Sequence, residues 1–424
     1  LRYRPPSMKG LILSGGKGTR LQPITFTSAK QLVPVANRPV LFYGIQAMAA
    51  AGIEEIGIII APETGDEIRE TAGDGSQFGV KITYIVQDEP AGLAHAVLTA
   101  EPFLGTDPFV MYLGDNLLQG GIDDLVTAFK AEEPDAMILL TPVPDPEHFG
   151  VAELKDGRVV ALAEKPPEPK TNLALVGVYL FTPQIHTAAK AIEPSARGEL
   201  EITDAIQWLI EHGHRVRHDL LDGWWLDTGK KDPLLESNRR VLEELEPRID
   251  GDLDESSEAD GRVVIEAGAK LVNSHVRGPA IIGAGTTLTN SYVGPFTSVA
   301  SGCEIVDTEI ENSVVLERAT TSIVGVSVFE SCSDDSAKAV SIMSAPVSLN
   351  ESPGYSCCIS RRSSRTNVTA SFVSAFWSFP GRRTITLNPM TVPSGEIKRL
   401  RSNGSLIAMR LVRNRSVWFI RLAS

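Results

Sequence analysis

The sequence predicts an α/β fold, in which a mainly parallel, Rossmann-like sheet carries helices on both faces and is followed by a short left-handed parallel β-helix. Three observations predict it. From residue 8 to about residue 246, β-branched runs alternate with segments of helical character. The runs are almost continuously apolar, which indicates strands buried on both faces. From residue 263 onward, apolar residues recur with a period of 17.

The elements of the first region follow one another in a βαβ order. We predict strands at 9–15, 55–61, 80–87, 108–115 and 136–143, and helices between them at 39–52 and 91–104. Later strand-like runs have no long helix between them, which favours an antiparallel extension at 151–154, 159–166 and 173–181. A last amphipathic helix has apolar residues at the spacing that core packing requires: Ile202, Ala205, Ile206, Leu209 and Ile210.

A repeating pattern of apolar residues follows a polar segment. Residues 247–262 are acidic and are expected to form a linker or exposed loop. Beyond them, a shift of 17 aligns three apolar columns: Ile265, Ile282, Val299 and Leu316; Leu271, Leu288 and Ile305; and Val276, Val293 and Ile310. Three apolar positions per turn suit a triangular β-helix with one inward residue on each side, which we place at 263–326. Seventeen residues beyond Ile305 stands Ser322, so that coil continues only through a one-residue slip to Ile323.

Charge is distributed unevenly along the chain. Residues 327–424 carry 13 Lys and Arg against 5 Asp and Glu, a net charge of +8, which leaves −21 on the first 326 residues of a chain whose total is −13. This basic segment is also rich in Ser and holds three of the four cysteines. We hypothesise that it is a frame-shifted or otherwise non-native translation. The alternative is a genuine disordered basic arm.

Composition excludes several classes of function. An acidic body argues against a nucleic-acid partner, although a few basic residues and a metal ion can still hold a nucleotide. No apolar run is long enough to cross a bilayer and the segment LRYRPPS has no secretory signal, so we expect no membrane partner and a cytoplasmic protein. The oligomeric state stays open, with a homo-oligomer as one expectation. Free thiols are expected, because no zinc-like or redox spacing relates Cys303, Cys332, Cys357 and Cys358.

A glycine-rich loop, SGGKGTRL, directly follows the first predicted strand. Gly15, Gly16 and Gly18 leave backbone N–H groups uncrowded, so that a phosphate chain can approach them. Arg20 and Lys30 can neutralise that phosphate. The loop matches neither the dinucleotide GxGxxG nor the P-loop GxxxxGK[ST], which argues against a dehydrogenase or an ATPase. Taken alone, it is equally a simple strand-to-helix turn.

The longer motif resembles the sugar nucleotidylyltransferase family. That family's signature has a GGxGTRL loop, a Pro and a Thr after it, and a Lys followed by a Pro-Val pair, and all of these occur within residues 15–35. The triplet Lys30-Gln31-Leu32 resembles the thymidylyltransferase branch in particular. The likeness runs from Met8 to about Val326 and includes the β-helix, which is similar to that of long-form members associated with sugar-modified natural products. It therefore implies a nucleotidyltransferase sheet, with a catalytic domain over residues 8–246.

The resemblance also assigns roles to residues of the nucleotide site. It implies that Arg20 and Lys30 are catalytic, and that further contacts to the nucleotide come from Gly15, Gly16, Gly18, Thr19 and Gln31. In the segment QDEPAGLAHA, Gln87 and the backbone at Gly92 would pair with the edge of thymine, for which an amide supplies both donor and acceptor. Relatives often have Gln where His95 stands. On its residues alone, the segment is a helix N-terminus after a loop.

Two aspartates at strand ends are candidate ligands of Mg²⁺. Asp115, in the segment LGDN, ends one predicted hydrophobic strand. Asp227, in the segment WWLDTG, ends another. Either aspartate alone is more often a capping residue, but the resemblance implies that both bind the ion. Mg²⁺ needs only one or two carboxylates in addition to a triphosphate, so the pair is chemically sufficient.

Three further segments resemble the family's sugar-phosphate pocket: 149–154, 163–166 and 177–181. There Glu164 would accept hydrogen bonds from sugar hydroxyls, while Lys165 would act as a catalytic residue that holds the sugar phosphate. By their residue types alone, the two are a solvated ion pair. Phe149 stands where relatives commonly carry Tyr. Other sugar-phosphate contacts implied by the likeness are Asn116, Gly150 and, in the segment RGELEITD, Glu199.

The reaction implied by the resemblance converts dTTP and α-D-glucose 1-phosphate into dTDP-glucose and pyrophosphate, as in deoxysugar and antibiotic biosynthesis. A phosphate oxygen of the sugar attacks the α-phosphorus in line with the leaving pyrophosphate. That oxygen is already anionic at neutral pH, so positioning and charge stabilisation replace a general base. Two alternatives remain. One is a related enzyme that uses another nucleotide or sugar phosphate, and the other is a non-catalytic regulatory subunit of the same fold.

Overall fold

The computed structural model describes residues 7–322 except 17, 19, 20, 22–24 and 26–28, together with the backbone of strands at 342–343, 359–364, 367–372, 398–402, 405–414 and 417–423. The chain divides into two compact units, Leu1–Ser237 and Asn238–Ser424. None of the helices in the described part is both long enough and apolar enough to cross a membrane. The hypothesis of a non-native or disordered tail concerns residues that lie mostly outside this description.

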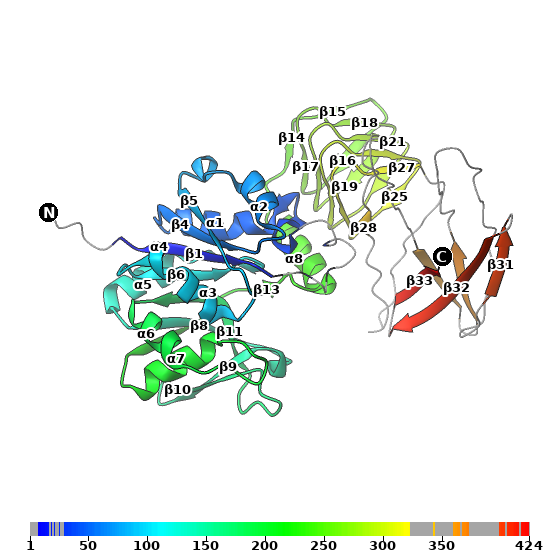
Figure 1. The fold of residues 1–424 in the computed structure, drawn as a ribbon. Helices are drawn as coiled ribbons and strands as arrows, with labels where there is room; N and C mark the ends of the chain where they lie inside the picture. The colour runs from blue at the N-terminus through cyan, green and yellow to red at the C-terminus, as the bar shows by residue number, and fades with distance from the viewer. Residues whose placement is uncertain are drawn as a thin grey trace. The chain divides into compact units, whose positions relative to one another are not determined.

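A nine-stranded mixed sheet forms the centre of the first unit (Figure 1). Its strands are β1 (Lys9–Ser14), β4 (Glu55–Ile60), β5 (Lys81–Val86), β6 (Phe109–Leu113), β8 (Ala136–Pro142), β9 (Gly150–Lys155), β10 (Arg158–Glu164), β11 (Leu173–Phe181) and β12 (Val216–Leu220). The order along the main path is β10-β9-β11-β6-β1-β4-β5, and β8 pairs with both β11 and β12. The strands β6, β1, β4 and β5 are mutually parallel, whereas β11 runs antiparallel to β6, β8 and β9.

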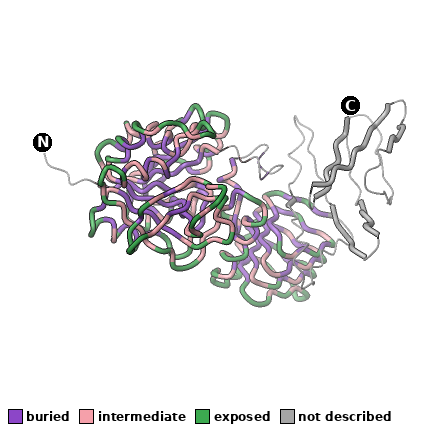
Figure 2. The backbone as a smooth tube through the Cα atoms, turned by 90° about the horizontal axis from the view of Figure 1, so that it is seen from below, coloured by how far each residue is buried: buried purple, intermediate pink, exposed green. Residues whose placement is uncertain are grey.

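Helices cover both faces of this sheet. They are α1 (Val40–Ala50), α2 (Gly65–Ala72), α3 (Leu93–Thr99), α4 (Glu101–Leu104), α5 (Asp123–Glu132), α6 (Gln184–Ala191) and α7 (Ile202–Glu211), with 3-10 turns at Lys30–Leu32, Ser76–Phe78 and Pro146–His148. A last helix, α8 (Lys231–Glu243), spans the division between the two units. Alternate strand residues enter two separate buried clusters: Leu11 and Met111 pack with α3, α6 and α7, while Ile12 and Val110 pack with α1, α2 and α5. Figure 2 shows this buried interior beneath an exposed periphery.

Two short strand pairs complete the first unit. Pro34–Val35 (β2) pairs with Arg38–Pro39 (β3), close to the glycine-rich loop in sequence. Asn116–Leu118 (β7) pairs antiparallel with Trp225–Asp227 (β13), which sets Asp227 opposite Asn116. The second pair therefore joins two segments that are more than a hundred residues apart in sequence.

The second unit contains three parallel sheets that wind as a β-helix. One is β14 (Arg248–Ile249), β17 (Val263–Ile265), β20 (Ala280–Ile282), β23 (Thr297–Val299), β26 (Val314–Val315) and β28 (Ile342–Met343). The next is β15 (Asp252–Leu253), β18 (Lys270–Val272), β21 (Thr287–Thr289), β24 (Glu304–Val306) and β27 (Thr320–Ser322), and the third is β16 (Glu258–Asp260), β19 (His275–Arg277), β22 (Tyr292–Val293) and β25 (Glu309–Ile310). The predicted fold class, an α/β sheet followed by a parallel β-helix, is confirmed.

The last coil departs from the predicted register. Val315, not Leu316, stands opposite Val299, and Thr321, not Ser322 or Ile323, stands opposite Ile305. The cause is a corner that is one residue shorter: Val293 and Ile310 are paired at the 17-residue spacing, whereas Ser298 pairs with Val314, 16 residues on. Burial agrees, because Val315 is 2% exposed and Leu316 is only half-buried.

The acidic segment 247–262, expected to be a linker, forms the first coil of the β-helix. Its strands β14, β15 and β16 pair in parallel with β17, β18 and β19. The repeat was hidden because Ile249 pairs with Ile265 at a spacing of 16 and Leu253 with Leu271 at a spacing of 18. A strict shift of 17 instead aligns the charged Arg248 with Ile265 and the charged Asp254 with Leu271, so the apolar pattern is not seen.

The remaining described strands are antiparallel. Ile359–Ser364 (β29) pairs with Asn367–Phe372 (β30), and Lys398–Ser402 (β31), Ser405–Asn414 (β32) and Val417–Ala423 (β33) form a three-stranded sheet.

Candidate functional site

The candidate site lies where four parallel strands end. Gly15 directly follows β1, Ala61 follows β4, Gln87 follows β5, and Asp115 lies two residues beyond β6. The carboxyl ends of parallel strands meet at one edge of the sheet, which is where open α/β sheets bind ligands. A small pocket at this edge is lined by Gly15, Ala61, Pro62, Glu63, Gln87, Asp88 and Pro90.

Two glycines of the loop pack against the Lys30 side chain. A Cβ atom on Gly16 would lie 2.8 Å from Lys30 Cε, and one on Gly18 would lie 2.8 Å from Lys30 Cβ. Gly18 also has a φ of +62°, and its carbonyl accepts a 2.6 Å hydrogen bond from Thr25 Oγ1. The loop therefore needs glycine for its own packing as well as for access. Thr19 and Arg20 lie outside the described residues, so their assignments stay predictions.

Lys30 forms an ion pair with Asp115 across the site. The ammonium group donates a hydrogen bond to Oδ2, and both side chains are largely buried, at 17% and 13% exposed. Burial alone would raise the pKa of the Asp115 carboxyl, but the charge and hydrogen bond of Lys30, with further donors including Asn116, hold that pKa below its ordinary value. Asp115 is therefore a carboxylate at neutral pH.

Asp227 lies beside Asp115. A Cβ atom on Gly229 would be 2.9 Å from Asp227 Oδ1 and 3.6 Å from Asp115 Oδ2, so both carboxylates border the same point. Thr228 fixes this arrangement, since its backbone N–H and its hydroxyl both donate to the Asp115 carbonyl. Two convergent carboxylates are a donor set that suits Mg²⁺ when a triphosphate and water supply the remaining oxygens.

The predicted base-reading residues also come together. The Gln87 amide lies 2.8 Å from His95 Nδ1, and a Cβ atom on Gly15 would be 3.3 Å from Gln87 Oε1. Gly92 has a φ of +105° and lies so close to Leu200 that a Cβ would fall 2.4 Å from the Leu200 carbonyl oxygen. Only glycine fits there. The His95 imidazole thus orients the Gln87 amide.

Gln31 is almost fully buried at 1% exposed, and its Oε1 atom has no hydrogen-bond partner among the described residues. A buried acceptor without a partner costs free energy, so such atoms are often completed by a ligand or water. This property suits the nucleotide contact expected of Gln31, which stays a prediction.

An aromatic bridge joins the carboxylates to the sugar side. Asn116 is 2% exposed, donates to Asp115 Oδ1 at 3.1 Å and accepts a hydrogen bond from Trp225 Nε1. The Trp225 ring packs edge-on against Phe149, with 5.3 Å between centroids. Phe149 therefore acts here as a packing partner of Trp225.

The sugar-side residues surround Glu164. Lys165 Nζ lies 3.0 Å from Glu164 Oε1, and Thr203 donates to Oε2 at 3.3 Å. Gly150 stands opposite Glu164 in the sheet, and a Cβ on Gly150 would be 3.0 Å from Glu164 Oε2. The Glu164 side chain is 19% exposed and that of Lys165 is 44% exposed, so Lys165 remains accessible to a solute.

Arg197 is a charged site residue that the sequence analysis did not single out. Its guanidinium contacts Glu201 at 2.8 Å, and Glu164 and Glu199 at 3.4 Å each. Burial opposes its charge, but the hydrogen bond and charges of these three carboxylates outweigh burial and raise the pKa of Arg197. The sequence could have indicated this role of Arg197, because in the segment RGELEITD one arginine is followed by three acidic residues.

These contacts close into a ring around one site. The segment that holds Glu199 returns to the base side, because Leu200 N–H donates to Ala91 O and Ala94 N–H donates to Leu200 O. Of the predicted residues, the structure brings together Gly15, Gly16, Gly18, Lys30, Gln87, Gly92, Asp115, Asn116, Gly150, Glu164, Lys165, Glu199 and Asp227.

Residues 9–244 match the nucleotidyl transferase family. The chain belongs to that family. The resemblance seen in the glycine-rich loop is thereby confirmed, and it covers the whole sheet that carries the ring of contacts.

Individual relatives of this nucleotidyl transferase are similar over more than the sheet. A glucose-1-phosphate thymidylyltransferase of Streptomyces griseus is 57% identical over 316 residues, which are 74% of this chain and 89% of the relative. One from Streptomyces antibioticus is 58% identical over 321 residues, 75% of this chain and 89% of the relative. A crystal structure from Bacillus anthracis, assigned to the same activity and solved with sucrose, has a TM-score of 0.52 and 39% identity, covering 55% of this chain and 94% of that one.

Proposed function

We propose that this nucleotidyl transferase is a glucose-1-phosphate thymidylyltransferase, which converts dTTP and α-D-glucose 1-phosphate into dTDP-glucose and pyrophosphate. One observation carries the proposal: the ring that joins Lys30, Asp115 and Asp227 also holds an amide suited to thymine and a Glu–Lys pair suited to a sugar phosphate. The close similarity to two relatives of that name supports it.

The residues divide the work between two anionic substrates. Gln87 and the Gly92 backbone would bind the edge of thymine, while the loop glycines and Gln31, with Arg20 and Thr19, would receive the triphosphate. Glu164 would accept hydrogen bonds from sugar hydroxyls, with Asn116, Gly150 and Glu199 around it. Lys165 would hold the attacking phosphate, since its side chain is 44% exposed and accessible to a solute.

Asp115 and Asp227 would hold Mg²⁺, which supplies charge neutralisation on the triphosphate when it is bound. Lys30 takes part in the same charge balance, because its ammonium group is held on Asp115 Oδ2 by the ion pair. No side chain has to remove a proton from the nucleophile. Catalysis then rests on orientation and on cations directed at the transferring phosphorus.

The sequence resemblance supports a further proposal, a place in deoxysugar or antibiotic biosynthesis. A cytoplasmic location is proposed from the sequence, which has no bilayer-crossing apolar run and no secretory signal in LRYRPPS. A homo-oligomer stays a prediction.

The test is a substrate comparison with the full chain. The protein is incubated with Mg²⁺, glucose 1-phosphate and, separately, dTTP, UTP, GTP or ATP, and pyrophosphate release and the nucleotide-sugar product are measured. We expect a clear preference for dTTP and no turnover by Asp227→Asn, which keeps the size of the side chain. Turnover with another nucleotide alone would overturn the assignment of thymine. A folded protein inactive with all four would favour a regulatory subunit.

A further inference from the structure

Three side chains of types that can ligate a metal ion, Glu258, Asp260 and His275, lie together on the β-helix and take no part in the ring of contacts. Strands β16 and β19 pair in parallel with Glu258 opposite His275 and Ala259 opposite Val276. Since side chains alternate along a strand, the buried Val276 and the half-buried Ala259 face the interior while Glu258, Asp260 and His275 share the outer face. The backbone ladder thus fixes three donors side by side.

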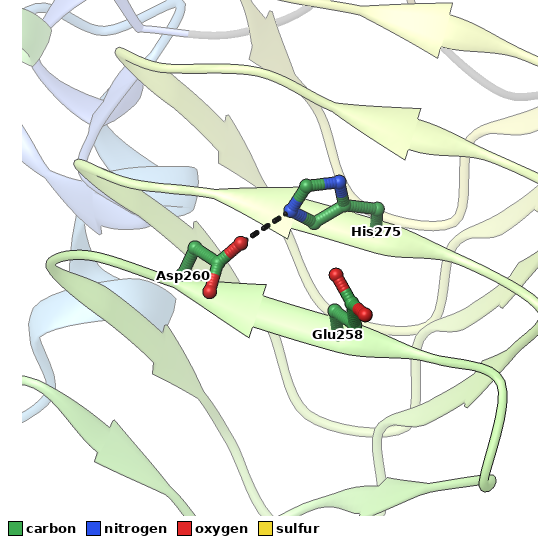
Figure 3. Close-up of side chains that lie close together, drawn as sticks. All are labelled: Glu258, Asp260 and His275. Carbon is green, nitrogen blue, oxygen red and sulfur yellow. Dashed lines mark hydrogen bonds and ion pairs between the residues drawn. The ribbon is translucent and has the colours of Figure 1, made fainter.

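The donor atoms of these three side chains converge. One ligand atom from each lies within 4.8 Å of the other two. His275 Nε2 lies 2.9 Å from Asp260 Oδ2, and Figure 3 shows the Glu258 carboxylate on the same side of the sheet, directed at the imidazole. Tyr292, the next residue in this column, packs edge-on against the His275 ring at 5.6 Å and restricts its rotation.

We propose that Glu258, Asp260 and His275 bind a divalent transition-metal ion of the Zn²⁺ type. One imidazole and two carboxylates are a donor set that suits Zn²⁺, with water in the fourth position, whereas Mg²⁺ prefers oxygen donors alone. Ligands about 2.0 Å from a tetrahedral ion are about 3.3 Å apart, so the His275–Asp260 contact has to open only slightly. Arg277, opposite Asp260 on the same face, is exposed and its long side chain can stay in solvent.

The position of the site gives the ion a structural task. β16 is the edge strand of its sheet, and the first coil contributes only the partly buried Leu253 and Ala259 to the interior. The next three coils bury a Val, Ile or Leu at each side, so the first coil gains less from hydrophobic burial than they do. An ion shared by β16 and β19 ties this weakly buried coil to the next, and any ion that binds only the folded state stabilises it.

Zinc binding to the full chain tests the proposal. Zn²⁺ is titrated into the protein by calorimetry in the presence of excess Mg²⁺, which occupies all-oxygen sites, and thermal unfolding is followed with and without Zn²⁺. We expect one Zn²⁺ ion per chain and a higher unfolding midpoint with the ion. His275→Gln should weaken Zn²⁺ binding by at least about 10–100-fold. Loss of a residue that only hydrogen-bonds to a ligand already costs that much, and His275 is itself a proposed ligand. Glu258→Gln should weaken Zn²⁺ binding in the same direction.

Glu309 provides the matched control for Glu258, because it occupies the same outer column three coils further on and lies opposite Tyr292 rather than a histidine. Glu309→Gln should leave Zn²⁺ affinity and the Zn²⁺-dependent midpoint unchanged. Without added Zn²⁺, His275→Gln should unfold at nearly the wild-type midpoint, which separates loss of the ion from misfolding. The proposal is overturned if the wild type binds no Zn²⁺ under these conditions, or if His275→Gln binds it as tightly as the wild type.

Discussion

Lys30 holds its ammonium group on a carboxylate oxygen that a metal ion would also contact. Asp115 Oδ2 accepts from Lys30 Nζ, and the same oxygen borders the point shared with Asp227. Two charges in a largely dry setting are tolerated because each compensates the other. The lysine therefore acts as an internal cation that keeps Asp115 ionised without a bound metal ion.

Replacing this internal cation should make the protein depend on an external one. Lys30→Met leaves the Asp115 carboxylate unpaired and should lower the free energy of unfolding by about 2–3 kcal/mol, somewhat less than for a fully buried pair. Millimolar Mg²⁺ should then raise the thermal unfolding midpoint of the variant more than that of the wild type. Turnover should be lost even where the ion restores stability. Equal stabilisation of both proteins by Mg²⁺ would contradict this account of Lys30.

His186 on α6 predicts a dependence of stability on pH. It is 5% exposed, stacks on Phe109, and neither ring nitrogen has a hydrogen-bond partner in the described part of the chain. Burial lowers its pKa, with Glu101 opposing and Lys190 reinforcing the effect. The unfolded state therefore binds a proton more readily than the folded state, so stability falls as pH drops below the ordinary histidine value of about 6.5.

The matched change is His186→Leu, which has similar volume and no ring nitrogen to desolvate. Urea unfolding at pH 8 and at pH 5.5 measures the loss of stability on acidification for each protein. The wild type should lose about 1 kcal/mol more than the variant, because other titrating groups contribute equally to both. If the two proteins lose the same amount, His186 is not buried as a neutral group.

At the scale of elements, Gly92 connects β5 to α3 through a conformation that only glycine tolerates. Gly92→Ala meets both a φ of +105° and the Leu200 carbonyl, so we expect a loss of about 1–3 kcal/mol of stability. The loop also carries the predicted thymine contact, and a loss of about 1.4 kcal/mol there means a tenfold higher KM for dTTP. Gly105→Ala is the control, since Gly105 also has a positive φ but open space around it. A similar rise in KM in the Gly105→Ala control would show that the close contact between Gly92 and the Leu200 carbonyl does not cause the effect.

A polar ladder follows one corner of the β-helix. Asn273 donates to Asn290, and Asn290 donates to Asp307, each 17 residues on and each with φ near +48° to +49°. Asn290→Ala loses both the ladder and the preference for this conformation, so it should cost about 2 kcal/mol, whereas Asn290→Gly keeps the conformation and should cost about half as much. Thermal unfolding of the two variants measures the difference. If both variants lose the same stability, the hydrogen bonds of Asn290 account for the whole effect and its backbone conformation contributes nothing.

Sequence patterns predicted local elements better than the pairings between them. The buried strand at 9–15 was placed almost as the structure has it, because a continuous apolar run next to glycines has few alternatives. The shift to Val315 and the first coil at 248–260 were missed, because a single residue lost or gained at a corner defeats a strict period. Most site residues could be placed because their motifs are local. Arg197 could not, because its role arises from Glu164, which is 33 residues away in sequence.

At the scale of the whole molecule, the candidate chemistry and the basic segment are separate in sequence. Every residue of the ring lies between Gly15 and Gly229, and the family match ends at residue 244. The relatives match about three quarters of this chain while matching 89% of their own length. About a quarter of the chain therefore lies outside the part that matches these relatives.

A chain that ends at Val326 should consequently keep its kcat with dTTP and glucose 1-phosphate. It should differ from the full chain in charge, because removing +8 leaves −21 on the remainder. Oppositely charged regions on one chain attract copies of it at low ionic strength, and salt screens that attraction over about 10 Å at 0.1 M. Light scattering should therefore show salt-sensitive association for the full chain and none for the shortened one. A folded shortened chain without turnover would instead make the basic segment part of the enzyme, and would count against its non-native origin.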